Sequence, residues 1–114
     1  MIEDMVGQVF TTVTGYEGEE EMVFSNSFWK FRFYHEQDCC ESVAISEIIG
    51  DLDDLIDTPI FEAREDGESD NGGDGSVTWT FYNFRTIKGS VTVRWYGTSN
   101  GYYSEAVYLE KVKQ

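Results

Sequence analysis

The chain has 114 residues, and its eight Lys or Arg against 22 Asp or Glu give a formal net charge of -14 at pH 7. This length predicts a single domain over residues 1–114. A hydrophobic content of 40%, with 16% aromatic residues, excludes a disordered chain, because this much apolar area offsets the entropy of ordering. No segment approaches the roughly 18 apolar residues of a membrane helix, and none reads as a secretory leader. We therefore expect a cytoplasmic protein.

The negative charge is concentrated in the middle of the sequence. Residues 36–74 contain fourteen acidic side chains and one basic side chain. Contacts to phosphates need cations, so this composition excludes unaided binding to DNA, RNA or an anionic membrane. It favours a partner with a basic surface, and the alternative is an acidic face that serves only solubility.

The first predicted elements are strands. Residues 8–14 and 21–26 alternate weakly around a Gly-containing turn and predict a hairpin. Residues 28–35 predict a third strand. One face of this strand carries Trp29, Phe31, Phe33 and His35, and the other carries Phe28, Lys30, Arg32 and Tyr34.

Residues 45–57 predict an amphipathic helix. Its aliphatic residues follow the i, i+3, i+4, i+7 spacing of one helical face: Ile45, Ile48, Ile49, Leu52, Leu55 and Ile56. Ser46 is the expected N-cap, and Pro59 ends the helix. The opposite, solvated face is expected to carry Glu47, Asp51, Asp53, Asp54 and Asp57.

Residues 60–65 predict a short strand, and residues 66–75 predict an exposed loop because they contain four Gly, four acids and no apolar residue. Acids at alternate positions of this loop are typical of the first half of a calcium-binding loop. However, Asn71 stands where the sharp turn needs Gly, and Val77 stands where a bidentate Glu belongs. We therefore expect a solvated loop and no specific calcium site.

The last forty residues carry the strongest β signal. Residues 77–82 and 91–96 alternate around a turn at Lys88-Gly89, and Asn100-Gly101 predicts a type I′ turn into a third strand within 102–112. The fold class predicted is therefore α+β: an antiparallel sheet of about six to seven strands, in the order β-β-β-α-β-β-β-β, with the one amphipathic helix packed on it. Whether the sheet is open or closes into a barrel stays undecided.

The only histidine and both cysteines lie within six residues, as His35, Cys39 and Cys40. Three interpretations stay open: reduced structural thiols beside a hydrogen-bonded histidine, a metal or small-ligand site formed by these three residues, or a vicinal disulfide that acts as a redox switch. Zinc sites usually use Cys pairs two to four positions apart, which this segment lacks. A thiol nucleophile is not expected, because nothing around the cysteines matches the known local motifs of cysteine proteases.

The tip of the last predicted hairpin is rich in Tyr and small polar residues, the composition of adaptable binding surfaces. Spaced carboxylates on the predicted helix would imitate the phosphate row of a nucleic acid and fit a basic groove. Together these features predict a partner-binding set: Glu47, Asp51, Asp53, Asp54, Asp57, Tyr96, Asn100, Tyr102 and Tyr103.

Two unusual strings are HEQDCCE at residues 35–41 and RWYGTSNGYYS at residues 94–104. With Gly50-Asp51-Leu52 and Thr78-Trp79-Thr80-Phe81-Tyr82, they resemble a family of small uncharacterised proteins met in phage and prophage genomes, over roughly residues 28–112. The resemblance implies expression from a phage or an integrated element in a bacterial cytoplasm. It implies no catalytic residue.

No phosphate-binding loop, Ser-His-Asp set or zinc-spaced Cys pair is present, so we expect neither an enzyme nor a cofactor. The sequence favours a non-enzymatic, phage-encoded binding protein that inhibits or modulates a basic host protein, for example in host defence. The alternative is a small-ligand or metal-binding domain centred on His35, Cys39 and Cys40. Direct contact with nucleic acid or membrane is not expected, and the oligomeric state stays open.

Overall fold

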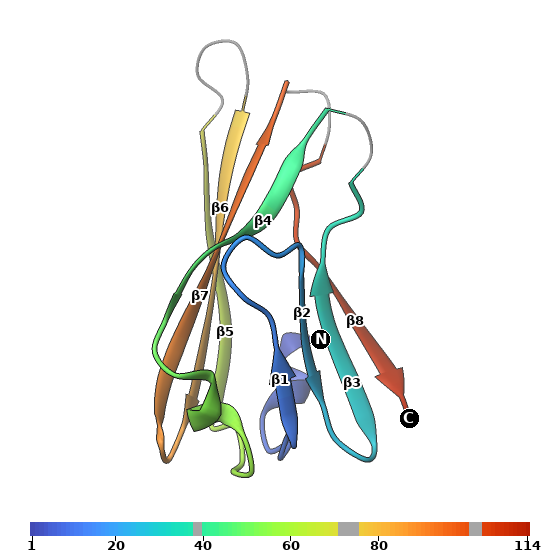
Figure 1. Cartoon of the computed structure of the whole chain (residues 1–114), viewed down its shortest axis with the longest axis vertical. Helices are drawn as coiled ribbons and strands as arrows, with labels where there is room; N and C mark the ends of the chain where they lie inside the picture. The colour runs from blue at the N-terminus through green and yellow to red at the C-terminus, as the bar shows by residue number, and fades with distance from the viewer. Residues whose placement is uncertain (38–39, 71–75, 101–103) are drawn as a thin grey trace.

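The computed structural model describes residues 1–37, 40–70, 76–100 and 104–114, except for the side chain of residue 70. Eight strands and two short 3-10 helices make up this part of the chain (Figure 1). In chain order they are η1 (Ile2–Met5), β1 (Thr12–Thr14), β2 (Glu21–Ser25), β3 (Trp29–Tyr34), β4 (Ser42–Ile49), η2 (Leu52–Leu55), β5 (Glu62–Asp70), β6 (Ser76–Thr86), β7 (Gly89–Ser99) and β8 (Tyr108–Lys113).

The strands form two four-stranded antiparallel sheets that pack face to face as a β-sandwich. One sheet has the order β1-β2-β3-β8, and the other has the order β4-β7-β6-β5 (Figure 1). The predicted α+β class is therefore wrong, because the described residues contain no amphipathic helix and only two four-residue 3-10 helices. The hairpin of β1 with β2, the strand β3 and the hairpin of β6 with β7 are confirmed.

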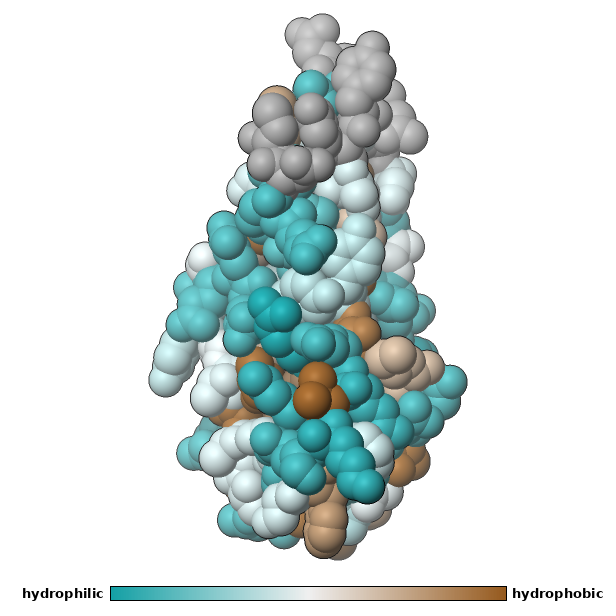
Figure 2. Space-filling view, turned by 90° about the vertical axis from the view of Figure 1, so that its right-hand side faces the viewer, coloured by the Kyte–Doolittle hydropathy of each residue, from teal (hydrophilic) through white to brown (hydrophobic). Residues whose placement is uncertain are grey.

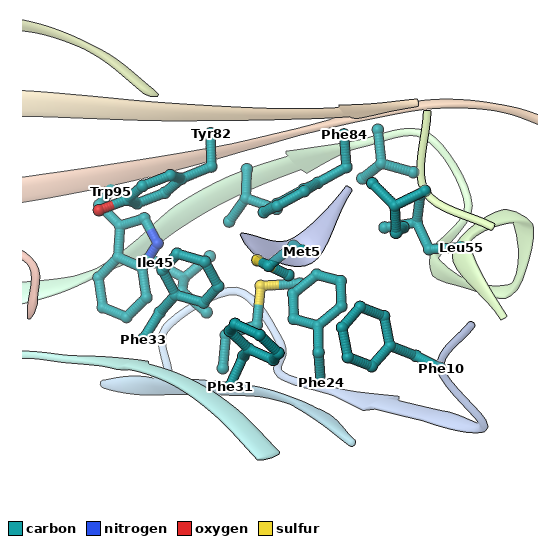
Figure 3. Packing of buried hydrophobic residues seen from close by; sticks show 14 of the residues in the cluster. Met5, Phe10, Phe24, Phe31, Phe33, Ile45, Leu55, Tyr82, Phe84 and Trp95 are labelled. Carbon is teal, nitrogen blue, oxygen red and sulfur yellow. The ribbon is translucent and has the colours of Figure 1, made fainter. Parts of the chain in front are cut away.

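The core lies between the sheets because alternate side chains of the strands point inward. Figure 3 shows aromatic rings of β2 and β3 facing those of β6 and β7, with Met5 of η1 between the layers. Phe24 packs against Phe84 with ring centroids 4.8 Å apart, and Phe33 packs against Tyr82 at 4.6 Å. Full burial of a ring of this size contributes about 1.5–3 kcal/mol, so these contacts between the two sheets stabilise the sandwich.

The predicted helix is a strand followed by a 3-10 turn, and a β-bulge explains the error. The pairing of β4 with β7 shifts register between Ile45 and Glu47. One extra residue in the strand places Ile45 and Ile48 on the same inward side three positions apart, which imitates helical spacing. Ser46, the predicted N-cap, is the exposed residue inside this bulge. The real cap is Asp51, whose side chain accepts a hydrogen bond from the Asp53 N–H at the start of η2.

Two further predictions fail near the end of the chain. The exposed loop was expected from residue 66, but β5 continues to Asp70 and pairs with β6 along its whole length, while residues 71–75 lie outside the described part. The predicted three-strand meander is also wrong. β8 does not follow β7 in the same sheet but crosses to the other sheet and pairs with β3.

Two sets of hydrogen bonds connect the sheets. One set lies along the β4 side of the sandwich, and the other is made by the buried Glu105 in the segment before β8. The loop between β1 and β2 hydrogen-bonds to β4, through Gly18 N–H to Ile45 C=O at 2.7 Å and Ile45 N–H to Glu19 C=O at 2.8 Å. Glu105 accepts hydrogen bonds from the Ser76 and Thr78 hydroxyls of β6. This contact fixes the segment before β8, and so positions the start of that strand.

Candidate functional site

A cavity lies on the outer face of the first sheet, where β3 ends and β8 begins. Its volume is about 900 Å³. We call it the acidic cavity, and it is lined by Glu20, Arg32, Tyr34, His35, Glu36, Gln37, Glu41, Ser104, Tyr108 and Glu110. Figure 2 looks at the right-hand side of Figure 1, toward which β3 and β8 lie, and shows a mostly hydrophilic surface.

The alternation of β3 and β8 places these side chains. Phe31 and Phe33 point into the core, so Arg32 and Tyr34 point outward. Register then sets Glu110 of β8 opposite Arg32, and Tyr108 opposite Tyr34. The wall of the cavity is therefore a block of four cross-strand neighbours, two charged and two aromatic.

Arg32 is held at the centre of this wall by carboxylates and a ring. Its Nε donates to Glu21 Oε2 at 2.9 Å, and its Nη1 lies 3.4 Å from Glu110 Oε2. Hydrogen bonding to Glu21, with a smaller contribution from Glu110, raises the pKa of Arg32 above its ordinary value. The guanidinium carbon also lies 4.0 Å from the centroid of the Tyr34 ring. The wall thus already binds one guanidinium group by ion pairing and a cation–π contact.

His35 and Glu41 form a buried pair at the inner end of the cavity. Their side chains are only 2% and 1% exposed, and His35 Nε2 lies 3.2 Å from Glu41 Oε1. The other ring nitrogen, Nδ1, lies 2.6 Å from the carbonyl oxygen of Ala106. Both ring nitrogens therefore face acceptors. A neutral imidazole donates from only one of its two nitrogens, so the tautomer decides which of the two oxygens receives its hydrogen bond.

Free carboxylates stand at the rim. Glu20 and Glu36 are exposed, and neither takes part in an ion pair or side-chain hydrogen bond among the described residues. Arg32, the one Lys or Arg of the lining, is already shared between two carboxylates. The cavity is thus a polar, tyrosine-walled hollow with unneutralised negative charge at its entrance, which suits a cationic group.

Comparison with family models identifies the chain. A model described as a domain of unknown function matches residues 3–109. The chain belongs to the DUF7448 family. A search of curated proteins and a search of solved structures each found no match to it. The expectation that the DUF7448 chain resembles an uncharacterised family is thereby confirmed, whereas its phage origin stays a prediction.

The residues of the predicted metal site are not arranged as a ligand set in the described part of the DUF7448 chain. His35 has both nitrogens engaged, as above. Cys40 is disulfide-bonded, which agrees with the third of the three interpretations and not with the first. Cys39 lies outside the described residues. No group of three or more His, Cys, Asp or Glu in the described part is placed to hold a metal ion.

The predicted partner-binding residues of the DUF7448 chain are dispersed. The Asp residues of the presumed helix lie in and around η2, where Asp51 caps the turn and Asp57 adopts a positive φ of 62°. Glu47 lies on β4, paired with Arg94 at 2.6 Å. The ring of Tyr96 packs on Trp79 on the outer face of the second sheet. The remaining members are Asp53 and Asp54 in η2, Asn100 after β7, and Tyr102 and Tyr103, which lie outside the described residues.

Most residues of the acidic cavity were missed as site residues, among them Glu20 and Glu36 at the rim and the wall residues Arg32, Tyr34, Tyr108 and Glu110. The sequence did place Arg32 and Tyr34 on the outward face of the third strand, and this was the available signal. The missing information was the pairing of β8 with β3, which brings Tyr108 and Glu110 from more than seventy residues away. The described DUF7448 residues also contain no helix long and apolar enough to cross a membrane.

Proposed function

We propose that this DUF7448 protein is a non-enzymatic binding protein, and that its acidic cavity receives a Lys or Arg side chain from the basic surface of a protein partner. The wider setting belongs to the same proposal: a phage or prophage origin, residence in the bacterial cytoplasm, and inhibition or modulation of a host protein. The cavity replaces the acidic helix as the proposed contact surface. The observation that carries the proposal is the arrangement of Arg32, which is already bound there as a guanidinium ligand would be.

The distribution of charge supports a basic partner. Five of the eight basic side chains are paired with the chain's own carboxylates: Arg32, Arg64, Arg85, Arg94 and Lys111. A sixth, Lys88, donates to the carbonyl oxygen of Ile56. Little positive surface remains to oppose the excess of acids, so the long-range field attracts cations and steers a basic partner toward the protein.

The geometry of the cavity gives this attraction a specific target. Tyr34 and Tyr108 lie side by side, with ring centroids 5.8 Å apart, and Tyr108 is 41% exposed. Glu20 and Glu36 at the rim supply carboxylates that no cation of the described chain neutralises. A ring face next to a carboxylate stabilises a guanidinium or ammonium group by cation–π attraction and charge-assisted hydrogen bonding.

A non-enzymatic role agrees with the state of the only histidine. His35 is almost completely buried, and both of its ring nitrogens are engaged with Ala106 and Glu41. A general acid or base must reach the proton that it transfers. His35 is instead placed to hold the ends of β3 and β4 and the segment before β8 together.

A small cationic ligand is a second candidate for the same cavity. The volume of about 900 Å³ falls in the usual range of ligand pockets, about 300–1,000 Å³. This candidate keeps the small-ligand hypothesis centred on His35. In this version the ligand contacts the outward-facing wall around Arg32 and not the cysteines.

The proposal is tested by affinity capture from nuclease-treated bacterial lysate at low and high salt, using three baits of known charge. These are the wild type, the Glu20→Lys/Glu36→Lys variant at the rim, and the Glu17→Lys/Glu19→Lys variant, which makes the same charge change outside the cavity. We expect the wild type and the control variant to capture a basic protein at low salt. We expect the rim variant to fail to capture it. Equal loss from both variants would contradict the cavity as the contact, and co-purification of a small cation without a protein would favour the second candidate.

A further inference from the structure

The strand β5 lies at the edge of its sheet, where η1 also contacts it. It pairs with β6 on one side and ends the order β4-β7-β6-β5 on the other. From Arg64 to Ser69 its residues are exposed, and none of them makes a backbone hydrogen bond outside the pairing with β6 in the described part of the chain. Unpaired N–H and C=O groups along an extended edge are a template for another strand.

The side chains along this edge decide which strand fits. Register places Asp66 opposite Phe81 and Glu68 opposite Trp79, on the outer face of the sheet. Glu68 has no ionic partner among the described residues, and Asp66 shares Arg64 with Glu62. On the inner side, Glu65 accepts a hydrogen bond from the Tyr82 hydroxyl at 2.7 Å, and Gly67 carries no side chain.

Like charges directly opposite each other destabilise a strand pair, whereas opposite charges stabilise it. The carboxylates of β5 therefore oppose pairing with the β5 of a second copy of the chain. For the same reason they favour an incoming strand with cationic side chains at the matching positions. We propose that β5 is an acceptor edge for β-strand addition by an extended, basic segment of a protein partner, with Lys or Arg at two positions separated by one residue.

The spacing of the two cationic residues in the added strand follows from the pleat of β5. Asp66 and Glu68 lie on one face two residues apart, so the two cationic residues of the added strand must also alternate with one residue between them. The residue between them faces the inner side beside Gly67, where a β-branched side chain fits the pleated surface. The added strand thus lengthens the sheet, and its backbone hydrogen bonds supply affinity while the charges select the sequence.

This surface is separate from the acidic cavity. Neither Asp66 nor Glu68 lines that cavity, and the inference does not depend on the function proposed for it. A partner that uses both sites is compatible with the proposal, but neither site requires the other.

The test uses the whole chain and the capped peptide acetyl-Thr-Val-Lys-Val-Lys-Val-Thr-amide, with binding followed by fluorescence anisotropy and backbone NMR. Two further peptides have the same sequence but carry N-methyl groups along one strand edge or along the other. We expect binding at low salt, with amide shifts centred on residues 64–69, and loss of binding for one of the two methylated peptides. No binding by the parent peptide, or equal binding by all three, would overturn the proposal, because charge alone does not distinguish a methylated edge.

Two variants of equal charge complete the test. Asp66→Lys/Glu68→Lys is expected to weaken binding about tenfold, since two attractive cross-strand pairs become repulsive. Glu17→Lys/Glu19→Lys, on the exposed loop between β1 and β2, is expected to change it little. A peptide with adjacent lysines, which point to opposite faces, should bind more weakly than the parent peptide. Equal losses for the two protein variants would show that net charge, and not the β5 edge, controls binding.

Discussion

His35 and Glu41 bury their side chains against each other, with Nε2 3.2 Å from Oε1, while the second ring nitrogen of His35 faces the carbonyl oxygen of Ala106. Three segments meet at this pair: the end of β3, the start of β4 and the approach to β8. The contacts of these buried side chains therefore hold together the segments that bound the inner end of the acidic cavity.

Loss of one partner of this pair should destabilise the fold strongly. His35→Ala removes the imidazole that faces the buried Glu41 carboxyl group, and we expect a loss of about 3–5 kcal/mol in the free energy of unfolding. Glu41→Gln should cost much less, because the amide donates to Nε2 of a neutral ring and its oxygen still accepts from the Cys40 N–H. Urea denaturation measures both, with the exposed Glu36→Gln as a control near zero. Equal costs for His35→Ala and Glu41→Gln would contradict this account of the pair.

Glu105 should make the stability of the fold depend on pH in the acid range. Burial raises its pKa, but hydrogen bonds from Ser76, Ser99 and Thr78 outweigh this, so the pKa of Glu105 lies below its ordinary value. The folded state then binds its proton less readily than the unfolded state. The contribution is present above the unfolded pKa of about 4.3 and is lost as the pH falls through the lower folded value.

The measurement is the urea midpoint as a function of pH for the wild type and for Glu105→Gln. We expect the variant to be less stable at neutral pH, by about 1–3 kcal/mol for a buried hydrogen-bonded group, and to lose less stability on acidification. Parallel pH profiles for the two proteins would show that Glu105 does not contribute to the loss of stability at acid pH.

Tyr82 should remain protonated at alkaline pH for as long as the protein is folded. Burial, together with a smaller effect of the neighbouring Glu65, raises the pKa of Tyr82 far above its ordinary value. Phenolate absorbance increases as tyrosines lose their protons. We expect this increase, measured up to about pH 11, to be the same in Tyr82→Phe as in the wild type. A lower amplitude for Tyr82→Phe, with near-UV circular dichroism showing an intact fold, would contradict this assignment.

Gly50 should tolerate no side chain. Its φ is +116°, and an added Cβ would lie 2.6 Å from the carbonyl oxygen of Ser90. Gly18 also has a positive φ, of +92°, but has nothing within 4 Å of that position. We expect Gly18→Ala to cost about 1–3 kcal/mol from backbone strain alone, and Gly50→Ala to cost clearly more. Thermal denaturation of both variants gives the comparison, and equal midpoints would show that the close approach to β7 is relaxed at little cost.

Local patterns predicted most of the strands but not their assembly. Alternation identified β3, β6 and β7, because burial alternates with a period of two along most of each strand. It failed at β4, where the bulge after Ile45 produced helical spacing, although the run of β-branched residues favours a strand. It found only the first part of β5, because both faces of the exposed second half of this strand are polar.

The candidate site was predicted only in part for a related reason. The sequence singled out His35 and the outward position of Arg32, but the cavity also needs Tyr108 and Glu110 from β8. Only the pairing of β8 with β3 brings them together, and no local pattern specifies which of two sheets a final strand joins.

The central claim is that the acidic cavity, and not net charge alone, recognises a cationic group. The most direct measurement is a calorimetric titration of a capped tri-arginine peptide at low salt into the wild type, Glu20→Lys/Glu36→Lys and Glu17→Lys/Glu19→Lys. We predict that the wild type and the loop variant bind with similar affinity and that the rim variant loses binding. Equal weakening in both variants, which carry the same net charge, would contradict the account.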